Sequence, residues 1–167
     1  MYELIGGKVY DLYKSNPLSY QNACALRLSR ALNYSGFPIS SGNGYYMAKG
    51  EDKLNYLFRV REMIKYINNK FSSPDVTINI QNGKIIRKDK GASKRVTHLT
   101  MDEAVKGLKG IIVFHVIGWG DATGHITLFS YQKAIGDLKS KCEDDSCYFE
   151  HDRANINTYK IKLWSLS

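Results

Sequence analysis

One cysteine and one histidine, about one hundred residues apart, have the local settings that thiol catalysis requires. Cys24 lies near the expected start of an amphipathic helix, in the stretch Asn-Ala-Cys-Ala-Leu-Arg-Leu. His125 follows a glycine-rich segment, residues 118–124, and begins an apolar strand. A thiol attacks an amide well only as thiolate, and a helix N-terminus and a neighbouring imidazolium both favour that form. The pair therefore predicts a cysteine hydrolase.

Each of these residues also has a purely structural interpretation. A single cysteine on an apolar helix is usually a small core residue, and His125 could be a strand-edge residue that faces solvent. Among the other histidines, His115 stands inside an apolar strand, where a hydrogen-bonded core histidine is expected. His98 and His151 stand in polar stretches and are expected at the surface. The glycines at 118, 120 and 124 favour His125, because they let the backbone approach a substrate closely.

A third group should accept a hydrogen bond from the imidazole and orient it. The acidic candidates that follow the histidine are Asp137, Asp144 and Asp145. The spacing does not choose among them, because the next strand and turn can return any of the three to the histidine.

The nucleophile must be held by the helical first part of the chain. A short helix or irregular segment is expected to end near residues 16–17, because the residue before proline avoids helical geometry. Ser19 or Asn22 can cap the next helix, which Gly36 and Pro38 end. Residues 39–50 are expected to form a loop. Apolar spacing predicts a second helix over roughly residues 52–70, which a Ser-Ser-Pro stretch ends.

The histidine must be held by strands. Alternation predicts a hairpin from residues 76–80 and 84–87 around an Asn-Gly turn, followed by an exposed basic loop at 87–95. Thr100 to Glu103 matches a capping box for a short helix that contains Gly107 and stops at Gly110. Residues 111–117 form a buried central strand, and residues 125–130 and 158–164 complete the sheet. Helices followed by mainly antiparallel strands indicate an α+β fold.

Length and composition limit the function classes. The chain has 167 residues, which fits one domain, 1–167, and no apolar run approaches the roughly 20 residues of a membrane helix. Residues 1–7 lack the basic and apolar regions of a secretory leader, so we expect none. The net charge of +8 suits either a soluble basic surface or a polyanionic partner. No nucleic-acid-binding motif accompanies that charge, so nucleic acid is not expected.

The remaining two cysteines predict a disulfide. Cys142 and Cys147 lie close together in an acidic stretch, and Cys24 stands apart from them. Three cysteines are the number needed for one small disulfide and one free thiol. Zinc is the competing interpretation, but the pair and His151 supply only three ligands, so no metal is expected. A disulfide would place the action of the protein in an oxidising compartment.

The segments around Cys24 and His125, Asn-Ala-Cys-Ala-Leu-Arg-Leu-Ser-Arg-Ala-Leu-Asn and Gly-Trp-Gly-Asp-Ala-Thr-Gly-His-Ile-Thr-Leu-Phe, resemble the fourth family of type VI secretion amidase effectors. The resemblance covers about residues 20–150. It implies a papain-like fold with N-terminal helices packed on the sheet, and no cofactor. It also implies cleavage of peptidoglycan stem peptides between D-glutamate and meso-diaminopimelate.

By the same resemblance, Cys24 is the nucleophile and His125 the base. The family's acidic residue lies near a cysteine pair, which favours Asp144 over Asp137. The chain departs from the family pattern here, because its segment 130–141 is longer and Phe129 replaces a tryptophan-containing strand end. The oxidised cysteine pair would then fix Asp144 toward His125.

The resemblance also implies where the protein acts and with what partners. It would be made in the cytoplasm without a signal peptide, pass through the type VI secretion apparatus into the periplasm of target bacteria without membrane insertion, and be inhibited by a cognate immunity protein. Two alternatives remain open. One is a papain-like deamidase or acyltransferase acting on another substrate. The other is a non-catalytic basic module that binds the cell wall and in which Cys24 belongs to the core.

Overall fold

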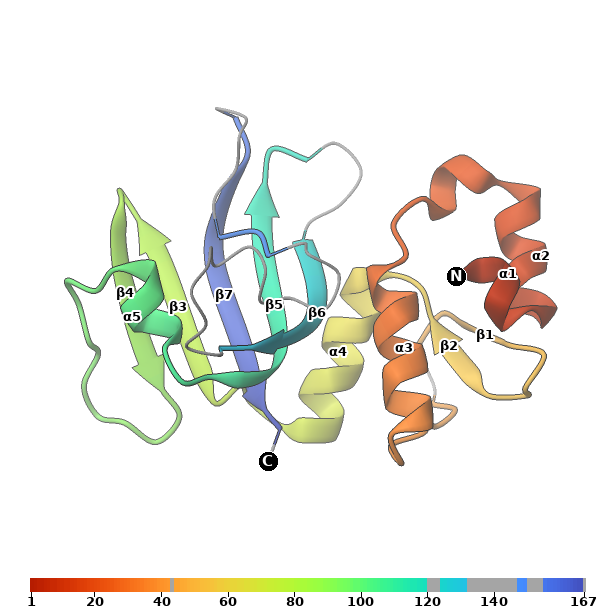
Figure 1. The fold of residues 1–167 in the computed structure, drawn as a ribbon, viewed down its shortest axis with the longest axis horizontal. Coiled ribbons are helices and arrows are strands. Elements are labelled where there is room, and N and C mark those ends of the chain that lie inside the picture. Colours follow the sequence, from red (N-terminus) through yellow and green to blue (C-terminus); the bar gives the residue numbers. More distant parts are fainter. Residues whose placement is uncertain (43, 120–123, 132–146, 150–154, 167) are drawn as a thin grey trace. The chain divides into compact units, whose positions relative to one another are not determined.

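The protein was analysed as a computed structural model that describes residues 1–42, 44–119, 124–131, 147–149 and 155–166 (Figure 1). It divides into two compact units, Met1–Ile67 and Asn68–Ser167. Each unit has its own cluster of buried apolar side chains. None of the helices in these ranges is long and apolar enough to cross a membrane. The expectation of a single domain over 1–167, with the helices packed on the sheet, stays a prediction.

The first unit begins with short helices, where the sequence predicts a short helix or an irregular segment that ends near residues 16–17. They are α1 (Tyr2–Ile5), α2 (Gly7–Ser15) and the 3-10 helix η1 (Pro17–Tyr20). Asn16 separates the last two, and its side-chain oxygen accepts a hydrogen bond from the Ser19 backbone N–H at 3.2 Å. Gly7 has φ +56°, and an added Cβ there would lie 2.7 Å from the Glu51 nitrogen. The turn between α1 and α2 therefore requires glycine.

The helix that carries Cys24 is confirmed as α3 (Cys24–Tyr34). Cys24, Leu28 and Leu32 lie on its buried face, as the i, i+4, i+8 spacing predicts. The helix ends at the C-cap Ser35, and Gly36 follows with φ +88°. On the same face, Ser29 accepts from the Leu57 N–H at 3.0 Å and donates to the Leu57 carbonyl at 2.9 Å.

The predicted helix over residues 52–70 is wrong in its first third. Strand β1 (Met47–Lys49) lies in the expected loop and pairs antiparallel with β2 (Asn55–Leu57), and helix α4 begins only later, spanning Val60–Phe71. A turn overrides the helical spacing. Lys53 has φ +65°, and the Asp52 side chain accepts from the Leu54 N–H at 3.0 Å. The two bonds between Ser29 and Leu57 hold β2 against α3.

The second unit is built on a five-stranded antiparallel sheet of order β4-β3-β7-β5-β6 (Figure 1). Strand β5 pairs with β7 on one side and β6 on the other, which confirms the predicted central strand. The predicted Asn-Gly hairpin is confirmed as β3 and β4, six residues each. The strands are β3 (Val76–Gln81), β4 (Lys84–Asp89), β5 (Lys109–Ile117), β6 (Gly124–Ser130) and β7 (Asn157–Ser165).

Helix α5 (Met101–Val105) begins with the predicted capping box but ends earlier than expected. The Thr100 Oγ1 accepts from the Glu103 N–H at 3.2 Å, and the Glu103 carboxylate accepts from the Thr100 N–H at 2.8 Å. Gly107 lies beyond the helix with φ +74°. Gly110 does not stop the helix either, since it belongs to β5, where a Cβ would collide with the Trp164 carbonyl oxygen.

The sequence predicts an exposed loop for the basic run 87–95, and this prediction is wrong for its first residues. Strand β4 continues to Asp89, and Arg87 exchanges two backbone hydrogen bonds with Val96. The half-buried Arg87 guanidinium donates to the Ala104 carbonyl at 2.9 Å and to the Asp89 carboxylate at 2.7 Å. An arginine with a long apolar stem can thus join a strand to a helix while its charge stays paired.

Candidate active site

Cys24 is the first residue of α3 and is 4 % exposed. The N-cap is Ala23, which makes no side-chain capping bond, so the expectation that Ser19 or Asn22 caps the helix is wrong. Asn22 instead accepts a hydrogen bond from the Cys24 backbone N–H at 3.1 Å. Cys24 is a free thiol. The first-turn N–H groups of a helix have no intrahelical acceptor, and the helix dipole favours negative charge there. The setting suits a thiolate and the oxyanion that forms when it attacks a carbonyl.

A tyrosine that the sequence analysis did not single out lies beside this thiol. Tyr2 is 7 % exposed, and its hydroxyl is buried with no hydrogen-bond partner among the described residues. Its ring stacks on Tyr13 at 4.7 Å between centroids and meets Tyr20 edge-on at 6.2 Å. Burial first, then the neighbouring Cys24, Tyr20 and Tyr13, raise the pKa of Tyr2 to about 12. Tyr2 is far from Cys24 in sequence and matches no motif, so only the fold reveals it.

A cavity of about 440 Å³ opens next to the cysteine helix within the first unit. Ala23, the residue before the nucleophile, lines it together with Tyr2. Four tyrosines line the wall, together with the carboxylate of Glu3 and the guanidinium of Arg27. The residues that line it are Met1, Tyr2, Glu3, Tyr10, Tyr13, Tyr20, Gln21, Ala23 and Arg27.

His125 is held in the second unit by aromatic rings. It is the second residue of β6, pairs in register with Phe114 of β5, and is 5 % exposed. Tyr148 meets the imidazole edge-on with centroids 4.9 Å apart, and the Phe114 ring lies 6.5 Å away. The alternative of a solvent-facing strand-edge histidine is therefore wrong. An imidazole whose ring is held in a fixed orientation suits a general base.

The predicted catalytic residues are divided between the two units. Cys24 belongs to the first unit and His125 to the second, so their pairing stays a prediction. All three acidic candidates, Asp137, Asp144 and Asp145, lie outside the described residues. The same holds for Cys142 and His151, whereas Cys147 is buried in the core of the second unit. Within the described ranges, no group of three or more histidine, cysteine or acidic residues could hold a metal ion.

His115 differs from its prediction as a hydrogen-bonded core histidine. Its Nε2 is buried without a hydrogen-bond partner among the described residues. Burial first, then Lys162 and Lys160, lower the pKa of His115 to about 4. The imidazole is therefore neutral at physiological pH, which removes the larger cost of burying a cation.

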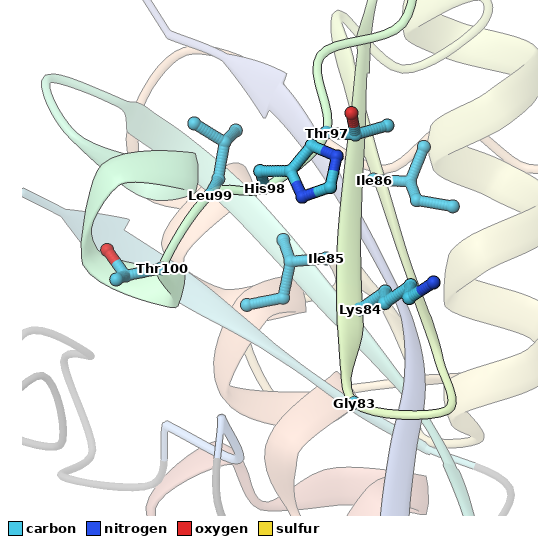
Figure 2. Close-up of a pocket in the computed structure, with 8 residues that line it drawn as sticks. All are labelled: Gly83, Lys84, Ile85, Ile86, Thr97, His98, Leu99 and Thr100. Carbon is cyan, nitrogen blue, oxygen red and sulfur yellow. The ribbon is translucent and has the colours of Figure 1, made fainter.

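A separate cavity of about 490 Å³ lies in the second unit at the start of β4 (Figure 2). Figure 2 shows Lys84 and Ile85 of the strand on one side and the segment with His98 and Leu99 facing them. His98 is exposed, as predicted, and has φ +63°. Neither Cys24 nor His125 is among the residues that line this cavity. The full lining is Gly83, Lys84, Ile85, Ile86, Thr97, His98, Leu99 and Thr100.

Comparison with known proteins decides the family. A family model described as "Type VI secretion system (T6SS), amidase effector protein 4" (Tae4) matches residues 20–164, a range that contains both Cys24 and His125. The chain belongs to this family. It is therefore an enzyme, a peptidoglycan amidase that serves as an antibacterial effector of type VI secretion and is delivered into target bacteria. A comparison with curated proteins gives no match.

Solved structures of the Tae4 family agree with the fold. Tae4 from Salmonella typhimurium, in complex with the immunity protein Tai4 from Enterobacter cloacae, is 29% identical with a TM-score of 0.74 and covers 99% of this chain and 86% of that one. Tae4 from Enterobacter cloacae is 29% identical with a TM-score of 0.72, covering 99% of this chain and 84% of that one. The predicted α+β class and papain-like fold are confirmed.

Proposed function

We propose that the chain is a cysteine amidase that hydrolyses the bond between D-glutamate and meso-diaminopimelate in peptidoglycan stem peptides, with Cys24 as nucleophile and His125 as base. One observation carries the proposal: the Tae4 family match spans both residues. In the structure Cys24 is a buried free thiol at the start of a helix, and His125 is a buried imidazole oriented by rings.

The reaction proceeds in two steps. The Cys24 thiol gives its proton to His125, and the thiolate attacks the γ-glutamyl carbonyl carbon. The carbon–nitrogen bond then breaks, His125 protonates the departing diaminopimelate amine, and a thioester remains on Cys24. In the second step His125 takes a proton from water, the resulting hydroxide attacks the thioester, and the sulfur leaves and regains its proton. Asp144 is the proposed acceptor for the second ring N–H of His125.

The proposed place of action is the periplasm of the target cell. A disulfide between Cys142 and Cys147 would suit that oxidising compartment. One fact supports it: Cys24 is a free thiol, which leaves the other two cysteines, Cys142 and Cys147, to pair with each other. The ring is small, so the expected gain is local order around Asp144 rather than a large gain in stability. The proposed partners are the type VI apparatus and a cognate immunity protein, since Tae4 in the solved complexes is bound by Tai4.

The test is digestion of purified sacculi, with fragments identified by mass spectrometry. Cys24→Ala should lower the rate of stem-peptide cleavage by at least about a thousandfold, because the covalent route is lost. The matched control is Ser35→Ala, a small polar residue at the other end of α3, which should cleave at the parental rate. Cleavage by Cys24→Ala at the parental rate would show that the mechanism is wrong. Loss of ammonia or acyl transfer, rather than two fragments, would instead favour a deamidase or an acyltransferase.

A further inference from the structure

The hydroxyl of Tyr2 is an unusual group in this fold. Tyr2 is buried, yet no described residue accepts or donates a hydrogen bond at its hydroxyl. Leaving a buried polar group without a partner costs on the order of 1–3 kcal/mol. By contrast, Tyr56 is fully buried and its hydroxyl donates to the Asp52 carboxylate at 2.6 Å. A phenylalanine in place of Tyr2 would keep the packing and remove the unsatisfied group.

The surroundings of Tyr2 indicate what the hydroxyl is for. Tyr2 belongs to the buried cluster against which Ala23 packs, and both residues line the cavity next to the cysteine helix. Stacking on Tyr13 and the edge contact with Tyr20 hold the ring in place. Ala23 directly precedes Cys24, so these contacts bring the Tyr2 side chain to the start of the cysteine helix. The raised pKa of Tyr2 agrees with this placement, since the charge of a Cys24 thiolate is one of its causes.

We propose that Tyr2 is a positioning residue for the nucleophile, whose hydroxyl donates a hydrogen bond to the Cys24 sulfur once that sulfur becomes a thiolate. The inference rests on the proposed role of Cys24. In the resting protein the Tyr2 hydroxyl makes no hydrogen bond to this sulfur. A neutral thiol is a weak acceptor and a thiolate a strong one, so the bond forms when the thiol loses its proton. When the thiol proton moves to the imidazole, the phenolic O–H keeps its own proton and stabilises the new charge.

The protonation state of Tyr2 fits this role. With its pKa raised to about 12, the phenol stays protonated throughout the neutral range and remains a donor. It does not compete with His125 as a base. The proposed hydrogen bond adds no proton transfer to the mechanism, because Tyr2 keeps its own proton in every step.

The experiment compares Tyr2→Phe with Tyr13→Phe in the full chain. Tyr13→Phe removes a hydroxyl from the ring stacked on Tyr2 and leaves the Tyr2 hydroxyl in place. Three quantities are measured: the thermal midpoint, the rate of Cys24 alkylation by iodoacetamide as a function of pH, and the rate of stem-peptide cleavage. The variant Cys24→Ala is included to measure the background alkylation at residues other than Cys24.

We expect Tyr2→Phe to alkylate at least about tenfold more slowly at neutral pH, with its profile moved to higher pH, because one charge-assisted hydrogen bond is lost. Cleavage should fall in proportion, while the thermal midpoint is unchanged or higher. Tyr13→Phe should keep the parental alkylation profile.

Three results would overturn the inference. Parental alkylation and cleavage in Tyr2→Phe would show that the hydroxyl has no role. Slower cleavage with a parental alkylation profile would place the hydroxyl on the substrate instead of the sulfur. A lower thermal midpoint that accounts for the lost activity would make the role structural. Activity in Cys24→Ala, in contrast, would refute the proposed function itself, so the two failures are distinct.

Discussion

The regions around Cys24 and His125 are built in different ways. Short-range contacts place the cysteine: it starts a helix, and Asn22, two residues earlier, accepts from its N–H. Long-range contacts place the histidine: its strand register sets it opposite Phe114, and its ring meets Tyr148. Tyrosine hydroxyls accompany the cysteine, whereas the rings of Phe114 and Tyr148 lie against the histidine. The start of the cysteine helix is thus fixed locally, whereas the position of the histidine depends on strand pairing.

The largest effect that separates the two regions is expected from His125→Gln. It should lower stem-peptide cleavage by about 10²–10⁴-fold, the usual contribution of a general base. Product formation from sacculi is the measurement. His98→Asn is the matched control, because His98 is exposed and asparagine tolerates its left-handed backbone. If both substitutions left cleavage unchanged, His125 would not be the base.

A smaller effect compares two of the buried tyrosines of the first unit, Tyr2 and Tyr56. Tyr56→Phe breaks the 2.6 Å hydrogen bond to Asp52 and should lower the free energy of unfolding by about 1 kcal/mol, whereas Tyr2→Phe should not lower it. Urea denaturation measures both. Equal losses in the two variants would contradict the distinction between a bonded and an unbonded hydroxyl.

The smallest effect concerns His115 in the second unit. Its pKa of about 4 lies below the ordinary value of 6.5, so the folded state favours the neutral ring. The contribution of this preference to the free energy of unfolding is fully present above pH 6.5 and is lost as the pH falls from 6.5 toward 4. His115→Leu should therefore lose less stability than the parent over that interval. Parallel thermal midpoints for the two proteins from pH 7 to pH 4 would contradict the buried neutral histidine.

Elements with strong local signals could be predicted from sequence. The Asn-Gly hairpin, the Thr100–Glu103 capping box and the apolar central strand are all present, because each depends on residues close together in the chain. The hairpin of β1 and β2 was missed, since Leu54, Leu57 and Phe58 have helical spacing while Asp52, Lys53 and the contacts with Ser29 decide the backbone.

The candidate site shows the same limit. Cys24 and His125 could be singled out because the glycine-rich approach to His125 and the helix start are local patterns. Tyr2 could not, because its relation to Cys24 exists only after α1 folds next to α3. His115 was expected to be hydrogen-bonded because buried polar groups usually are, and the apolar strand pattern gives no information about which groups face its ring.

The central claim is that Cys24 and His125 act as one pair, and the alkylation of Cys24 tests it most directly. The rate with iodoacetamide would be followed from pH 5 to pH 9 in the full chain, in His125→Gln and in His98→Asn. If imidazolium stabilises the thiolate, the parent and His98→Asn should react rapidly near neutral pH, and His125→Gln should react at least about tenfold more slowly, with its profile moved toward that of an ordinary thiol. Identical profiles for all three proteins would contradict the pair.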